Sequence, residues 1–103
     1  MSVLNVVDSV GDAPSALLEF IHAVLEGGNL QAWRVEIWGC RCEGECDYTT
    51  IYFGLCSSLE ETKDLFLHEA AHAIMETKGK VPYEEWHGTE WQGIYDRLKE
   101  RYL

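Results

Sequence analysis

The stretch His68-Glu69-Ala70-Ala71-His72 decides how the rest of this chain is organised. On an α-helix, residues four apart lie one turn above each other on the same face. A helix through this stretch would direct the imidazoles of His68 and His72 toward one point, where both could ligate the same metal ion. Glu69 would lie beside them, close to a water at that ion. The pattern therefore predicts a helix that carries part of a metal site.

The residues around this stretch also predict a helix. Upstream, residues 57–61 (SSLEE) contain two overlapping capping boxes, in which a serine and a glutamate three residues later satisfy the first N–H groups of a helix. Apolar side chains then recur at near-helical spacing up to Met75, and no proline or glycine interrupts the segment before Gly79. We therefore expect the stretch to lie inside one long helix.

H-E-x-x-H on a helix is the arrangement of zinc metallopeptidases, in which the glutamate is the general base. In this chain His68 and His72 would bind Zn²⁺, and Glu69 would take a proton from water and later deliver it to the leaving amine. The alternative is that both histidines are ordinary core or surface residues of a helix. A catalytic zinc usually has three protein ligands and one open position, so one ligand must come from elsewhere.

Two downstream residues are candidates for the third ligand. His87 is the one histidine that follows the helix, and Gly88 beside it would let the backbone bend toward the metal. Glu90 is the alternative ligand; otherwise it would hydrogen-bond to a ligating imidazole. The metzincin extension is excluded, because Met75 and Lys78 stand where that pattern requires glycine and histidine.

The H-E-x-x-H motif, followed fifteen residues after its second histidine by His87-Gly88 and then by Trp91, resembles the SprT-like minimal metalloprotease family, which includes Spartan. The resemblance covers Trp33 to about Arg97. It implies a zinc-dependent endopeptidase, and some relatives cleave proteins that are crosslinked to DNA. It also implies a general base and three zinc ligands, at Glu69, His68, His72 and His87.

Other parts of the site are open to more than one interpretation. Tyr83 and Tyr95 are candidate donors to the oxyanion, although tyrosines in a small core more often only pack. Trp86 and Trp91 are expected to pack around the site. An exposed edge of a sheet could hold an extended substrate by strand addition.

Before the motif helix, the sequence predicts two strands joined by a hairpin turn. Residues 33–37 alternate between apolar and charged side chains, and residues 48–55 place three apolar side chains on one face. Between them, residues 43–45 (EGE) have the composition of a turn. Two strands joined in this way would form a small antiparallel sheet.

Helices are expected on both sides of this hairpin. One begins near Asp12, has an apolar stripe and ends at Gly27-Gly28. Another covers about Thr89 to Tyr102, and residues 2–10 form either a short edge strand or a tail. Residues 1–103 are therefore expected to form a single α+β domain with a minimal zincin-like fold. In that fold the small hairpin-based sheet packs against three helices, with the motif on the central one.

Four cysteines follow the pattern C-x-C-x3-C-x9-C. If the hairpin turns near Gly44, Cys40, Cys42 and Cys46 cluster at its tip, whereas Cys56 lies about 30 Å farther along an extended strand. Three alternatives remain: reduced thiols, a second metal or redox site of the three clustered cysteines, and a Cys42–Cys46 disulfide.

The charge of the chain is strongly negative, at -10, with 18 acidic and 8 basic residues. Residues 1–62 hold only Arg34 and Arg41 against ten acids. Direct nucleic-acid binding is therefore not expected, because no clustered bases are present for phosphate contacts. No lysine or arginine precedes Arg34 and no apolar run approaches membrane-spanning length, so the cytoplasm is the simplest location.

These observations predict a small soluble zinc metallopeptidase that acts on a protein or peptide substrate. The alternative from another class is a non-catalytic module, in which zinc only stabilises the fold and the acidic surface binds a partner protein. Glu69 favours the enzyme, because a purely structural zinc site does not need a base.

Overall fold

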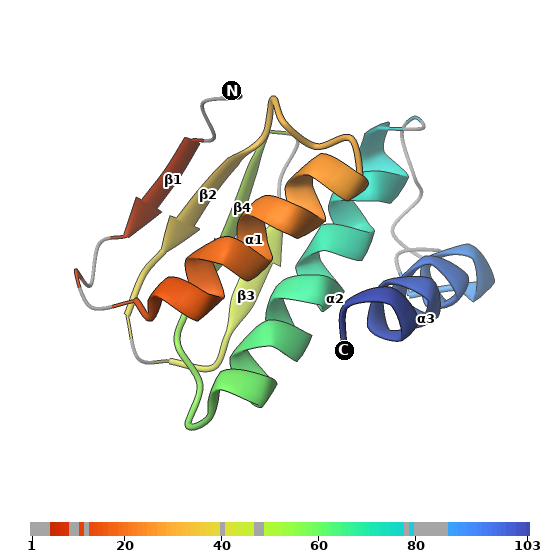
Figure 1. Ribbon diagram of the computed structural model, residues 1–103. Coiled ribbons are helices and arrows are strands. Elements are labelled where there is room, and N and C mark those ends of the chain that lie inside the picture. Colours follow the sequence, from red (N-terminus) through yellow and green to blue (C-terminus); the bar gives the residue numbers. More distant parts are fainter. Residues whose placement is uncertain are drawn as a thin grey trace.

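The computed structural model describes residues 5–8, 11, 13–39, 41–46, 49–77, 79 and 87–103. These residues form a four-stranded mixed sheet and three helices (Figure 1). Helices α1 (Ser15–Gly27) and α2 (Leu59–Thr77) lie over the same face of the sheet, and α3 (Thr89–Tyr102) packs against α2. Helix α2 is therefore the central element, in contact with two helices and two strands.

The strands follow the order β1-β2-β4-β3 across the sheet. β1 (Asn5–Asp8), β2 (Arg34–Ile37) and β4 (Thr50–Phe53) are parallel to one another. β3 (Gly44–Cys46) is antiparallel to β4 and forms the edge of the sheet beside α2. The first segment of the chain is thus an edge strand, one of the two alternatives that its sequence allowed.

The α+β class is confirmed, but the predicted antiparallel hairpin between residues 33–37 and 48–55 is wrong. Both segments contain a strand, yet these strands are parallel neighbours. Residues 43–45 do not form a turn either, because Gly44 and Glu45 belong to β3. The alternation of apolar and charged side chains indicates which face of a strand is buried, but it does not indicate which strand pairs with it. The twelve residues between β2 and β4 are enough for a strand that runs back along the sheet.

The core lies between the sheet and the two helices that cover it. Val35 and Ile37 of β2, with Ile51 and Phe53 of β4, are fully buried. Phe66 of α2 joins these strands to α1, because its ring lies 5.3 Å from that of Phe53 and 6.3 Å from that of Phe20. The apolar stripe of α1 also faces this core, as its pattern predicted, with the buried side chains Leu17, Phe20, Ile21, Val24 and Leu25.

The helix boundaries agree closely with the expectations from sequence. At the start of α2, the Glu61 N–H donates to Ser58 Oγ at 3.1 Å, so the predicted capping interaction is present. Helix α3 covers the predicted range. The predicted cap of α1, Asp12, lies outside the described residues. No helix in the described part of the chain has both the length and the apolar composition needed to cross a membrane.

A disulfide joins Cys42 to Cys56, with the two Cα atoms 4.5 Å apart. The predictions of reduced thiols at Cys42 and Cys56, of a Cys42–Cys46 disulfide and of a three-cysteine site are therefore wrong, since Cys42 is bonded to Cys56. Cys40 lies outside the described residues. The physical reason is the hairpin formed by β3 and β4. The residues just before β3 and just after β4 meet at the same end of that hairpin, whereas the 30 Å separation assumed a chain that continues in one direction.

This disulfide should contribute measurably to stability. It closes a loop with a sequence separation of 14, for which the chain-entropy model gives about 3 kcal/mol. We expect reduction to lower the free energy of unfolding of the native chain by about 2–4 kcal/mol in urea titrations. The Cys42→Ser/Cys56→Ser double variant should show no such response to reductant. An equal effect of reductant on both proteins would contradict the assigned pairing.

Candidate metal centre and adjoining cleft

Three histidine side chains converge beside α2. His68 and His72 lie one turn apart on this helix, and His87 precedes the first turn of α3. One ring nitrogen from each lies within 4.8 Å of the others, and the Nε2 atoms of His72 and His87 are 3.0 Å apart. A tetrahedral zinc about 2.0–2.1 Å from each nitrogen would separate the nitrogens by roughly 3.3 Å. The three imidazoles therefore lie close enough to bind one metal ion after small adjustments.

Trp91 holds the three histidine rings together. It lies in the first turn of α3, and only 5% of its surface is exposed. Its indole is stacked on His72, with the ring centroids 5.2 Å apart, and meets His68 and His87 edge-on at 4.7 and 4.8 Å. The prediction that Trp91 packs around the site is confirmed; Trp86 lies outside the described residues.

The lowered pKa values of His68 and His72 favour metal binding. Burial, followed by the neighbouring His68 and His87, lowers the pKa of His72 to about 4. Burial and then His87 also lower the pKa of His68, against an opposing effect of Asp64. Both rings are consequently neutral at neutral pH, and a neutral imidazole has the lone pair that a metal requires.

Glu69 is buried between α2 and the edge of the sheet, with 6% of its surface exposed. A Cβ atom on Gly44 of β3 would lie 2.8 Å from both Cγ and Oε2 of Glu69, so the side chain packs directly against the glycine backbone. Its Oε2 lies 3.9 Å from Nε2 of His68. Burial and then Glu45 raise the pKa of Glu69 to about 7. A carboxylate with such a pKa can both accept and release a proton at neutral pH.

A cleft of about 450 Å³ adjoins these groups. Residues 42–44 line one wall, and α2 supplies the other through side chains that include Asp64, His68 and Glu69. Tyr95 of α3 also reaches the cleft. One ligand of the candidate metal site and the buried carboxylate are therefore accessible from a cavity large enough for part of a peptide.

The other predicted site residues have distinct positions. The Tyr95 hydroxyl donates to Asp64, and its ring is stacked on Trp91 at 5.0 Å; burial and Asp64 raise its pKa. Its role as an oxyanion donor stays a prediction, and Tyr83 lies outside the described residues. Glu90 is exposed in the first turn of α3 and is not part of the group of three histidines.

Sequence reasoning missed two residues that shape this site. Asp64 lies one turn before His68 on α2, and this four-residue spacing was a usable signal. Gly44 was interpreted as part of a turn, and nothing in its local sequence indicated the contact with Glu69.

No protein-family model matches the chain, and neither a curated protein nor a solved structure is significantly similar to it. A function for this site must therefore be inferred from its geometry and chemistry.

We expect His87→Ala to weaken zinc binding most strongly, because it removes one of three converging ligands. The matched control is His22→Ala, since His22 is exposed on α1 and outside the group of three. Glu90→Ala should weaken binding by only about 10- to 100-fold, if Glu90 orients an imidazole. Competition with a chromophoric chelator measures all three. Loss of binding in Glu90→Ala with binding retained in His87→Ala would reverse the assignment.

Proposed function

We propose that this chain is a small zinc metallopeptidase of the SprT-like type, which hydrolyses peptide bonds in proteins or peptides. The observation that carries the proposal is the convergence of His68, His72 and His87 beside the buried carboxylate of Glu69, at the end of an open cleft. Three imidazoles leave one position of a tetrahedral zinc for water or substrate, as catalytic sites require.

The donor set fits zinc, because it consists of three imidazoles, two from α2 and one that directly precedes α3. When bound there, the ion would polarise a peptide carbonyl and make water a better nucleophile near neutral pH. The rings themselves would need little movement, since Trp91 already packs against all three.

Glu69 would perform the proton transfers. It would accept a proton from the attacking water as the oxygen bonds to the peptide carbon, and then give that proton to the amine as the C–N bond breaks. A pKa of about 7 suits both steps. Its contact with the Gly44 backbone restricts the side chain to the side of α2 that faces the cleft.

Strand β3 is the element on which an extended substrate would lie. The Gly54 N–H donates to the Glu43 carbonyl at 3.0 Å. Because hydrogen-bonded and non-hydrogen-bonded pairs alternate in antiparallel ladders, the N–H and C=O of Gly44 point away from β4, toward the open edge. A peptide that pairs with this edge by strand addition would pass next to Glu69.

A non-catalytic, zinc-stabilised binding module is the second candidate, and the net charge of -10 is the observation that favours it. Such a surface suits a basic partner protein better than nucleic acid. The burial of Glu69 favours the peptidase, because an unneeded buried carboxylate would only destabilise a binding module.

Glu69→Gln tests the proposal with two readouts. It should retain zinc and lower the cleavage rate of a labelled unfolded protein by about 10²- to 10⁴-fold, the usual contribution of a general base. Because the pKa of Glu69 rises from 4.5 to about 7 on folding, the ionisation of Glu69 should cause a loss of stability in the metal-free native chain as the pH rises through this range, whereas His72, whose pKa is lowered, contributes in the opposite direction. Glu69→Gln should remove that loss, and be more stable at pH 8 by up to about 3 kcal/mol.

The matched control is Glu100→Gln, which changes an exposed carboxylate on α3 and should leave both quantities unchanged. Full hydrolysis by Glu69→Gln would contradict the mechanism. Zinc binding by the native chain without any chelator-sensitive cleavage would favour the binding module.

A further inference from the structure

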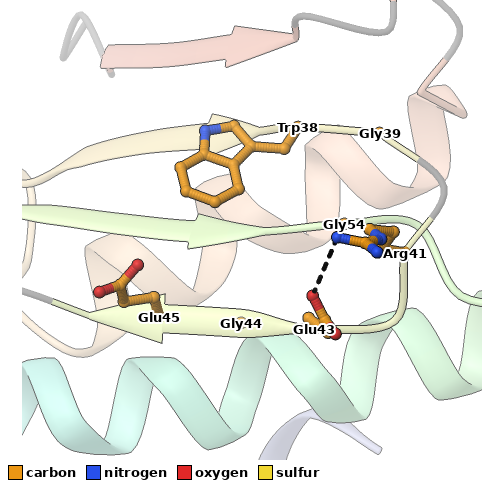
Figure 2. Close-up of a pocket in the computed structure, with 7 residues that line it drawn as sticks. All are labelled: Trp38, Gly39, Arg41, Glu43, Gly44, Glu45 and Gly54. Carbon is orange, nitrogen blue, oxygen red and sulfur yellow. Dashed lines mark ion pairs between the residues drawn. The ribbon is translucent and has the colours of Figure 1, made fainter.

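A second hollow, of about 210 Å³, lies on the face of the sheet opposite α1 and α2 (Figure 2). Tyr52 alternates with the buried Ile51 and Phe53 along β4, so its ring lies on that opposite face. Trp38, which follows β2, packs against Tyr52 and forms one wall of the hollow. The hollow is smaller than a typical drug-sized pocket and suits one side chain.

Trp38 is the most exposed large apolar side chain among the described residues, at 55%. Its ring centroid lies 4.8 Å from that of Tyr52, with a tilt of 44°. The indole also lines the hollow, and Figure 2 shows it on the same side of the sheet as the Glu45 side chain. An indole face attracts cations more strongly than the other aromatic rings do.

The opposite wall carries negative charge. Glu43 and Glu45 both line the hollow, and both are exposed. Arg41 is the one basic residue in this lining, and its Nη1 lies 3.9 Å from Oε2 of Glu43. Such an exposed pair is weak. In the described part of the chain no ion pair neutralises Glu45, so the hollow keeps an uncompensated carboxylate opposite the indole.

Gly54 and the backbone of Arg41 lie between these walls. Gly54 lies opposite Glu43 across the β3–β4 ladder, between this residue and Trp38. A Cβ atom at Gly54 would overlap the Arg41 carbonyl oxygen, so this position cannot accept a side chain without moving the backbone. The backbone of Arg41 therefore occupies the space next to Gly54 and forms part of the lining of the hollow.

We propose that this hollow binds an arginine side chain of a peptide partner. A guanidinium is planar and stacks on an indole face, and its N–H groups match carboxylate oxygens. Trp38 supplies the stacking surface and Glu45 the main carboxylate, with Glu43 beside it. The site lies across β3 from the metal centre and does not depend on hydrolysis, so its test stands apart from that of the proposed peptidase.

The test is an NMR titration of the metal-free full chain, labelled with ¹⁵N, with N-acetyl-arginine amide. We expect saturable shifts of the Trp38 indole and Gly54 amide signals, with a dissociation constant on the order of 1–10 mM, as for one exposed side chain. The neutral isostere N-acetyl-citrulline amide should bind at least about 10-fold more weakly if charge contributes as cation–π and ion-pair interactions usually do.

Variants distinguish binding of the arginine compound in this hollow from non-specific attraction of a cation to an acidic protein. Trp38→Ala should abolish the saturable shifts, and Glu45→Gln, which keeps the size of the side chain, should weaken binding by about 3-fold or more. Glu19→Gln removes an exposed carboxylate from α1 and should leave binding unchanged. Equal binding of the citrulline compound, shifts centred on Asp64 and His68, or full binding by both hollow variants would overturn the proposal. Equal binding of N-acetyl-lysine amide would overturn the assignment to arginine.

Discussion

Trp91 contacts all three histidines at once, and the candidate site depends on this packing of α3 against α2. A helix can align His68 with His72 through its own periodicity, but only tertiary packing can bring His87 to them. The buried indole contacts all of these rings, and this packing reduces the conformational entropy that metal binding must overcome. Burial in the same packing lowers the pKa values of His68 and His72 and keeps these two rings neutral.

Strand β3, at the edge of the sheet, imposes the second constraint, which acts on the Glu69 side chain. Glu69 is buried where β3 passes close to α2, and a Cβ atom at position 44 would lie 2.8 Å from its Cγ and Oε2. Burial of a carboxylate is unfavourable, and the raised pKa of Glu69 measures that cost. The Cys42–Cys56 disulfide fixes the segment that leads into β3. Stability elsewhere in the fold thus compensates for the cost of burying the Glu69 carboxylate, the residue proposed as the general base.

Local patterns predicted the parts of the structure that local forces determine. The positions of His68 and His72 follow from helical periodicity, and the start of α2 follows from its capping residues. The partner of each strand was not predictable in this way, because pairing depends on contacts between distant residues. Because the hairpin was predicted between the wrong strands, neither the proximity of Cys42 to Cys56 nor the contact of Gly44 with Glu69 was predicted.

X-ray absorption spectroscopy at the zinc edge tests the central claim most directly, with the full chain loaded with one equivalent of zinc. The claim is that His68, His72 and His87 together form one metal site. It predicts a shell of nitrogen or oxygen atoms at about 2.0–2.1 Å, with the multiple scattering of three imidazoles. A sulfur shell near about 2.3 Å, or a signal from fewer than three imidazoles, would contradict it.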